Sequence, residues 1–382
     1  MSSSPSTSLN GGGREWPHHM LQEIYEQPES LDRTIAMYSA EGRLRPEFVE
    51  RVRPLVSAPD MIVVASGSSR HAGLTGEIAI EDLAGLPVDV EYASEYALRP
   101  ATARKQAAVL AISQSGETAD TLGALRAANE RGHRTMAITN VEGSSMAREA
   151  GVSLPTPAGR EVAIPATKSF TAQLTVLHLL ALAAAEVRGS MQEAEIATRL
   201  QRLAALPRSI AAQLPDWERA VEAVAPFYSR AKTLLFLGRG IHYPMAREGA
   251  LKLKESSYLH AEGYPTGELR HGPNALVSPE VPLVVIATRD TADADSVRRY
   301  ESTLQLLEGM KKQGATVLSI ANRGDAAVSD LSTHTLFVDE QPEHLLPIEE
   351  VIPLQMLAYF VAVRNGVDVD RPRNLSKAVL VE

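Results

Sequence analysis

The sequence predicts an α/β protein of two related units, each a parallel sheet covered on both faces by helices. Three observations support this prediction. Short apolar segments alternate with longer helix-like segments along the chain. Most of the short segments show no polar alternation, which indicates strands that are buried on both faces. The same order of segments occurs twice within the 382 residues, which indicates a repeated unit.

The first unit is expected over residues 45–190. Residues 61–65 (Met-Ile-Val-Val-Ala) predict a buried strand, which ends in a Ser-Gly-Ser-Ser turn before a helical pattern that continues to Ala84. A strand at 108–112 precedes the loop Ser-Gln-Ser-Gly and a helix to about Arg131. The remaining elements expected in this unit are strands at 88–92 and 135–139 and a long apolar helix at 171–187.

The second unit is expected over residues 215–365 and repeats this order. Its first strand, at 233–237, ends in a Gly-Arg-Gly turn and leads into a helix, as the first strand of the other unit does. Strands at 282–287 and 315–320 follow, and an apolar helix at 353–363 closes the unit. The repeated order therefore predicts the same fold in both halves.

Four flanking segments complete the expected organisation. Residues 1–18 are rich in Ser and Gly and predict a disordered tail without the apolar run of a secretory signal, so we expect a cytoplasmic protein. Residues 19–44 predict a helical segment that is interrupted around Pro28. A helical linker is expected at 191–214, and a polar C-terminal tail that carries catalytic residues at 366–382.

The composition argues against several classes of function. Lys and Arg number 38 against 47 Asp and Glu, and this net charge of −9 disfavours a general nucleic-acid or membrane binder. The sequence contains no cysteine, which excludes disulfides, thiolate metal sites and cysteine nucleophiles in this chain. The most apolar stretch, residues 174–187, is shorter than the ~20 residues of a transmembrane helix and predicts a core helix.

The turn after the strand at 108–112 carries side chains suited to a phosphate group. Residues 113–118 read Ser-Gln-Ser-Gly-Glu-Thr and join a strand to a helix, whose first N–H groups are unpaired and carry partial positive charge. The alternative is that the hydroxyl side chains only cap the helix. Ser68 and Ser69, in the equivalent turn after the first strand, would close the other side of the same pocket.

A second group of candidates lies in the second unit and the C-terminus. Glu248, Lys252 and Glu255 are spaced i, i+4 and i+7, so they share one face of a helix. Such spacing more often marks an exposed, salt-bridged face than a site. A Gly- and Pro-rich loop then carries His271, and the polar tail carries Lys377, whose amine would form a Schiff base if desolvated. A structural histidine and an exposed lysine are the alternatives.

From about His19 to Glu382 the chain resembles the sugar-isomerase half of glutamine–fructose-6-phosphate aminotransferase. The resemblance rests on motifs in the same order: MLQEIYEQP, SQSGETADT, NVEGSSMARE, TKSFTAQLTVL, EGALKLKE, GELRHGP and DVDRPRNLSK. It implies two flavodoxin-like SIS domains in a homodimer, a phosphosugar substrate, and no metal, nicotinamide or pyridoxal cofactor. The family's glutaminase half uses a cysteine nucleophile, and this chain has none, so we expect no glutaminase activity.

The resemblance also implies roles for single residues. Glu255 matches the base that moves a proton between C1 and C2 of the sugar, and Lys252 matches the lysine that stabilises charge on the intermediate. His271 matches the ring-opening histidine, which the neighbouring subunit supplies, and Lys377 matches the lysine that forms a Schiff base with the ketose. The phosphate is expected on Ser113, Gln114, Ser115 and Thr118, beside Gly67, Ser68, Ser69 and Ala166, with Glu248 in support.

Three departures from the family pattern affect the sugar pocket. The family's Cys-Gly-Thr-Ser turn is Ser-Gly-Ser-Ser here. Its Ala-Ser-Thr-Lys loop is Pro-Ala-Thr-Lys at 165–168, which removes one hydroxyl, and the lysine before the loop histidine is Arg270. These changes preserve the expected phosphate site and leave the identity of the sugar open.

A free-standing pair of SIS domains is similar to the SIS-type glucosamine-6-phosphate deaminases. This similarity predicts conversion of glucosamine 6-phosphate to fructose 6-phosphate and ammonium. Three alternatives stay open: another SIS phosphosugar enzyme (an isomerase, a deglycase or a galactosamine-6-phosphate deaminase), an ammonia-dependent synthase, and a phosphosugar-sensing regulator without catalysis. The retained Glu255, Lys252, His271 and Lys377 disfavour the regulator.

Overall fold

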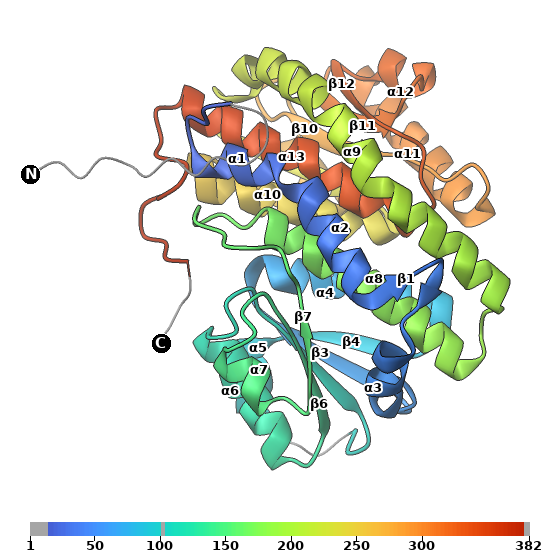
Figure 1. The fold of residues 1–382 in the computed structure, drawn as a ribbon. Coiled ribbons are helices and arrows are strands. Elements are labelled where there is room, and N and C mark those ends of the chain that lie inside the picture. The colour runs from blue at the N-terminus through green and yellow to red at the C-terminus, as the bar shows by residue number, and fades with distance from the viewer. Residues whose placement is uncertain (1–13, 101–103, 378–382) are drawn as a thin grey trace, which may run out of the picture.

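The structure, a computed structural model, describes residues 14–100 and 104–377 and has two parallel five-stranded sheets (Figure 1). The first contains, in spatial order, β4 (Val88–Tyr92), β3 (Met61–Ala65), β5 (Ala108–Ile112), β6 (Arg134–Thr139) and β7 (Val152–Pro155). The second contains β9 (His260–Pro265), β8 (Thr233–Gly238), β10 (Leu283–Ala287), β11 (Val317–Asn322) and β12 (His334–Val338). Both follow the doubly wound order 2-1-3-4-5, so the predicted fold of two related α/β units is confirmed.

Helices cover both sheets. Those of the first unit are α3 (Pro46–Val56), α4 (Gly67–Ala84), α5 (Ala93–Leu98), α6 (Ala119–Glu130), α7 (Ser145–Glu149) and α8 (Lys168–Arg188). Those of the second are η1 (Gly240–His242), α10 (Tyr243–Ser257), η2 (Thr266–His271), η3 (Pro273–Leu276), α11 (Ala294–Lys312), α12 (Ala326–Leu331) and α13 (Leu346–Arg364). Outside the two units lie α1 (His19–Tyr25), α2 (Gln27–Tyr38), the short strands β1 (Ser39–Ala40) and β2 (Arg43–Leu44), and α9 (Glu193–Tyr228).

The flanking segments pack against the two units. Pro28 lies in the first turn of α2, directly after the end of α1, because proline lacks the N–H that a helix interior requires. From residue 193 onward, the expected linker at 191–214 lies within α9, a single helix of 36 residues that also includes the start of the expected second unit. It runs along one side of the molecule past both sheets (Figure 1).

Only part of the expected N-terminal tail falls within the described residues. Arg14 pairs with Glu218 of α9 at 2.6 Å, and its guanidinium lies 4.3 Å from the centre of the Trp16 ring. At the other end of the chain, Asp370 accepts hydrogen bonds from the first backbone N–H groups of α1 at 2.8 and 2.9 Å. The beginning of the described chain is therefore held against its end.

Each sheet is buried on both faces, as the apolar strands predict. In β3, Met61, Val63 and Ala65 belong to the central hydrophobic cluster, whereas Ile62 and Val64 belong to a second cluster under α5 and α6. The strand β8 divides its side chains between two clusters in the same way. Consecutive side chains on a strand point to opposite faces, so an all-apolar strand needs helices on both sides.

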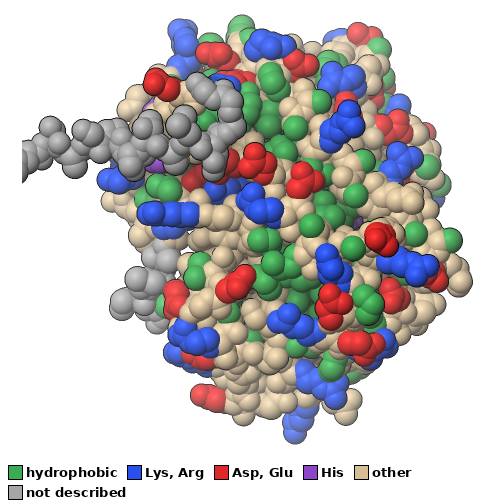
Figure 2. Space-filling model, viewed as in Figure 1, with side chains coloured by type: hydrophobic (Ala, Val, Ile, Leu, Met, Phe, Trp, Pro, Cys, Tyr) green, Lys and Arg blue, Asp and Glu red, His purple; other side chains and the backbone are tan. Residues whose placement is uncertain are grey.

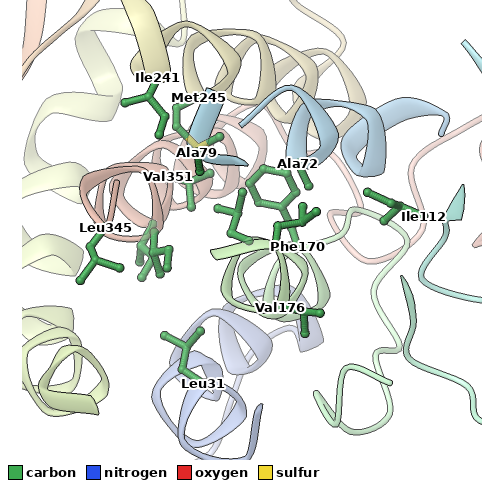
Figure 3. Close-up of a cluster of buried hydrophobic side chains, with 14 of the residues drawn as sticks. Leu31, Ala72, Ala79, Ile112, Phe170, Val176, Ile241, Met245, Leu345 and Val351 are labelled. Carbon is green, nitrogen blue, oxygen red and sulfur yellow. The ribbon is translucent and has the colours of Figure 1, made fainter. Parts of the chain in front are cut away.

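The central cluster joins the two units. Figure 3 shows Leu31 of α2, Ala72 of α4, Phe170 of α8, Met245 of α10 and Val351 of α13 converging on one core. The helices α4 and α10 also contact each other directly. The first helix of each unit is thereby placed beside its counterpart, which brings side chains of α10 to the first sheet.

Two helices, α8 and α13, are long and apolar enough to cross a membrane by length and composition alone. Within the protein, 89% of each apolar window is buried, which is typical of core helices. The face shown in Figure 2 mixes Lys and Arg with Asp and Glu, without a continuous field of one sign.

Candidate active site

A cavity of about 260 Å³ lies at the carboxyl ends of β3 and β5. These strands flank the switch point of the 2-1-3-4-5 order, where doubly wound folds bind their ligands. We call this space the active-site cavity. Its lining includes Gly67, Ser68, Ser69, Ser113, Gln114, Ser115, Thr118, Ala166, Lys252, Glu255 and Lys377. The structure therefore brings together all the predicted site residues except Glu248 and His271.

The two turns at the cavity place the first backbone N–H groups of two helices beside it. Ser66 and Thr118 are the N-cap residues of α4 and α6, and neither side chain makes a capping hydrogen bond. The Thr118 hydroxyl instead lies 2.9 Å from the hydroxyl of Ser113. Because neither N-cap side chain occupies the first N–H groups of its helix, the two helix ends and the hydroxyl groups offer donors to an anion such as phosphate.

The tight shape of the second turn depends on Gly116. Its φ is +66°, and an added Cβ would lie 2.1 Å from the Ser144 hydroxyl and 2.7 Å from the Thr139 hydroxyl. The N–H of Gly116 donates to the Ser113 hydroxyl at 3.2 Å. A larger residue here would push the turn away from α7, so glycine is needed to position the hydroxyl groups.

The predicted pair on α10 faces the cavity and not solvent. The Lys252 side chain is 1% exposed and contacts the carboxylate of Glu255, which is 22% exposed. Burial lowers the pKa of Lys252, but the carboxylates of Glu255 and Glu248 outweigh it and raise that pKa overall. The cavity thus has a fixed cation next to a carboxylate that reaches the open space, a pair suited to acid–base chemistry near a developing negative charge.

Glu248 lies beneath the cavity and does not line it. Its side chain is fully buried, accepts a hydrogen bond from the Ser68 hydroxyl at 2.8 Å, and lies 2.8 Å from Nδ1 of His71. Burial favours the neutral acid, but Lys252 and His71, together with Ser68, lower the pKa of Glu248 overall. Glu248 therefore joins the two units below the site and supports Lys252 at 3.5 Å.

Lys377 lines the cavity and is held there by an acidic residue that the sequence analysis missed. Its Nζ donates to Glu161 Oε2 and to the carbonyl of Ala163, both at 2.6 Å. Burial raises the pKa of Glu161, but Lys377 lowers it overall, helped by hydrogen bonds from Thr167 and Ser169. The only sequence signal for Glu161 is an acidic residue directly before the apolar run Val-Ala-Ile that leads into the Pro-Ala-Thr-Lys loop.

A second residue that sequence reasoning missed is Gln173. Its amide donates to the Ser69 hydroxyl at 3.1 Å from the buried face of α8, which orients Ser69 at the edge of the cavity. The sequence did offer a signal for Gln173, namely an amide side chain within an apolar core helix. Buried polar side chains need a hydrogen-bond partner, so such a residue indicates a specific contact.

His271 does not reach the cavity of its own chain. It ends η2, is exposed, and is absent from the cavity lining. Its predicted contribution to the site of a neighbouring subunit stays a prediction. Of the expected C-terminal tail, residues 378–382 lie outside the described part of the chain.

Within residues 14–100 and 104–377, no group of three or more His, Asp or Glu side chains is placed to hold a metal ion. The chemistry of the described site rests on carboxylates, amines and hydroxyl groups.

Comparisons with known proteins agree with this architecture. Residues 54–183 and 227–364 each match the family described as SIS domain. The chain is 43% identical to the glutamine–fructose-6-phosphate aminotransferase of Chlorobaculum tepidum over 380 residues, 98% of this chain and 60% of that protein. The Aquifex aeolicus enzyme of the same name is 42% identical, with 98% and 59% covered. The chain thus spans about 60% of the length of these relatives.

Two solved structures are similar over nearly the whole chain. The C-terminal domain of glucosamine-fructose-6-phosphate aminotransferase from Francisella tularensis has a TM-score of 0.87 and 36% identity, with 95% of this chain and 100% of that chain covered. A glucosamine-6-phosphate deaminase from Thermotoga maritima has a TM-score of 0.71 and 25% identity, with the same coverage. The chain belongs to the SIS domain family, with one SIS domain in each half.

Proposed function

We propose that the protein is a glucosamine-6-phosphate deaminase, which converts glucosamine 6-phosphate and water to fructose 6-phosphate and ammonium. The main support is a single cavity that combines a phosphate cradle, the Lys252–Glu255 pair and the amine of Lys377. The similarity to a solved deaminase along the whole length of that chain gives independent support.

The first steps bind and open the sugar. The phosphate lies on the turn at 113–118, where helix N–H groups and hydroxyl groups neutralise its charge. His271 of a partner subunit moves the proton that opens the ring and frees the C1 aldehyde. This step requires a homodimer, which is therefore part of what we propose.

The central step moves a proton from C2 to C1. Glu255 takes the C2 proton, which the neighbouring carbonyl makes acidic, and the ammonium of Lys252 stabilises the negative charge that develops on O1. Return of the proton to C1 gives the C2 imine of fructose 6-phosphate. Water adds to C2 and the C–N bond breaks, which releases ammonium. Alternatively, Lys377 exchanges with the nitrogen first and its Schiff base is then hydrolysed.

The same chemistry run backwards would make glucosamine 6-phosphate from fructose 6-phosphate and free ammonium. This chain contains no cysteine that could release nitrogen from glutamine by the thiol route. We therefore propose that glutamine is not its nitrogen donor.

The test is ammonium release from glucosamine 6-phosphate by the purified chain, with fructose 6-phosphate measured in parallel. We expect equal amounts of both products and no glucosamine 6-phosphate from glutamine plus fructose 6-phosphate. Galactosamine 6-phosphate, a fructosamine phosphate and unaminated hexose phosphates form the substrate panel. Turnover of one of these with no ammonium from glucosamine 6-phosphate would overturn the proposal.

A further inference from the structure

A second cavity, of about 300 Å³, lies beside the active-site cavity. It is bounded by α4, α10 and the edge strands β4 and β9, and Gly67 lines both cavities. Three cationic side chains line it: Arg70 from α4, and Arg247 and Lys254 from α10. We call it the Arg70 pocket. None of the roles proposed above uses these three residues.

The cations of the Arg70 pocket have no carboxylate partner in the part of the chain that the structure describes. Within residues 14–100 and 104–377, none of the three forms an ion pair, although the chain carries a net charge of −9. Nε and Nη1 of Arg70 are buried without a hydrogen-bond partner among these residues. Elsewhere in the second unit, Arg299 and Arg323 bind carboxylates at 2.7 and 2.9 Å. Buried donors without partners are costly, so this arrangement favours an anionic ligand.

Aromatic rings accompany these charges. Arg70 lies 3.8 Å from the centre of the Tyr92 ring, and Arg247 donates to the Tyr92 hydroxyl at 3.3 Å. Tyr264 lines the same pocket and donates to Glu262. The cations of the pocket would bind the phosphate group of a ligand. The aromatic rings and the Glu262 carboxylate would contact a ligand portion that carries hydroxyl groups.

A chain of side chains connects this pocket to the active-site cavity. His71 lines the Arg70 pocket, and its Nδ1 lies 2.8 Å from Glu248. Glu248 in turn binds Ser68 at 2.8 Å and Lys252 at 3.5 Å, both of which line the active-site cavity. An anion beside Arg70 would change the electrostatic environment of His71, and through Glu248 that of Lys252.

We propose that the Arg70 pocket binds a small phosphorylated metabolite and that its occupancy alters turnover in the active-site cavity. The ligand is a phosphate ester with a hydroxylated body, either a second molecule of the substrate or another phosphorylated compound. The binding part stands on the geometry of the pocket alone, whereas the effect on turnover rests on the proposed function.

Binding is tested by calorimetry with sorbitol 6-phosphate, which has no carbonyl and cannot be isomerised, and with inorganic pyrophosphate. We expect two sites per chain for sorbitol 6-phosphate. The double variant Arg247→Gln with Lys254→Gln should lose the site in the Arg70 pocket. The double variant Ser113→Ala with Thr118→Val should weaken binding in the active-site cavity at least tenfold. Arg298→Gln on α11 is the matched control and should retain both sites. Far-UV circular dichroism verifies that each variant folds.

One site per chain, insensitive to the Arg247 and Lys254 changes, would overturn the proposal, because it would place all binding in the active-site cavity. Pyrophosphate at the second site with no sorbitol 6-phosphate there would overturn the assignment of a hydroxylated ligand.

The effect on turnover is tested by steady-state kinetics with glucosamine 6-phosphate and each probe. A ligand that competes only at the active-site cavity raises KM and leaves kcat unchanged. We expect the probe that occupies the Arg70 pocket to change kcat, and we expect this change to vanish in the Arg247→Gln, Lys254→Gln variant. Purely competitive behaviour in both proteins would overturn the coupling. If glucosamine 6-phosphate is not a substrate at all, the calorimetric result still decides the binding site, so the two failures are distinct.

Discussion

The two SIS domains share a strand order but use their switch points differently. Ser69 is the fourth residue after β3 and Ser113 is the first after β5, and both line the active-site cavity. The corresponding positions after β8 and β10 are His242 and Thr288, which are buried. His242 lies 2.8 Å from Glu350, and Thr288 donates to the same carboxylate. Small hydroxyl side chains leave space for a phosphate in the first unit, whereas an ion cluster fills the corresponding place in the second.

The difference shows how one fold serves chemistry and stability. The side chains of His242, Glu343 and Glu350 pair with one another at the second switch point and occupy the place that a phosphate would need. The second unit contributes α10 instead, which delivers Lys252 and Glu255 across the central core to the first unit. Changes at the first switch point and on this face of α10 should therefore alter activity, and changes at the second switch point should alter stability.

The largest effect on activity is expected from Glu255→Gln. The amide retains the size of the side chain but cannot take the C2 proton, so kcat should fall about 10²- to 10⁴-fold. Calorimetric binding of sorbitol 6-phosphate should be retained, because Glu255 is not part of the phosphate cradle. Wild-type turnover by this variant would show that Glu255 is not the base.

A smaller effect is expected from the phosphate cradle. Ser113→Ala and Thr118→Val remove two hydroxyl groups that lie 2.9 Å apart at the N-terminus of α6. Each hydrogen bond to a charged group contributes roughly 1.5–3 kcal/mol, so KM should rise about 10- to 100-fold for each variant. Steady-state kinetics provides the measurement, and Ser329→Ala, at an α12 position remote from this cavity, provides the control. An unchanged KM in both variants would contradict the cradle.

Only part of this account could be predicted from the sequence. Strands such as β3 and β5, apolar on both faces, were identified because their pattern is unambiguous. The edge strands β7 and β12 were missed because they are half exposed and carry polar residues, Ser153 in one and His334 and Thr335 in the other. The motif residues of the site were found through the resemblance. Glu161, His71 and the Arg70 pocket were not, because contacts between distant segments of the chain leave no local pattern in the sequence.

A mixing experiment tests whether His271 acts in the site of a partner subunit. Separately purified Glu255→Gln and His271→Ala proteins should each be nearly inactive. After subunit exchange, half of the dimers would be mixed, and one of their two sites would hold both wild-type residues. Activity should then recover to about one quarter of the wild-type value. No recovery despite verified exchange would place His271 in its own subunit's site or outside the reaction.

The smallest effect on turnover, and a large one on stability, is expected from His242→Gln. Burial lowers the pKa of His242, but Glu350 and Glu343 outweigh it and raise the pKa to about 10, against 6.5 for an unperturbed histidine. Because the folded state binds the proton more tightly, this stabilisation is complete below pH 6.5 and is lost as the pH rises toward 10. The variant leaves two buried carboxylates without this cation, which should cost roughly 3–5 kcal/mol near neutral pH.

Urea unfolding between pH 6 and 10 provides the measurement for His242. The wild-type protein should lose stability over this range, and the variant should show a weaker dependence while its kcat stays within about twofold of the wild-type value. Identical pH profiles of stability for both proteins, or a large loss of kcat without loss of stability, would contradict the claim that the second switch point serves stability and not catalysis.

The most direct test of the central claim follows the fate of the hydrogen on C2. Glucosamine 6-phosphate deuterated at C2 is incubated with the wild-type, Glu255→Gln and His242→Gln proteins, and NMR records where the deuterium goes. The account predicts a primary isotope effect on kcat/KM and loss of deuterium from C2 with the wild-type and His242→Gln proteins, and retention with Glu255→Gln. Loss of the label at the wild-type rate in the Glu255→Gln protein would contradict the account.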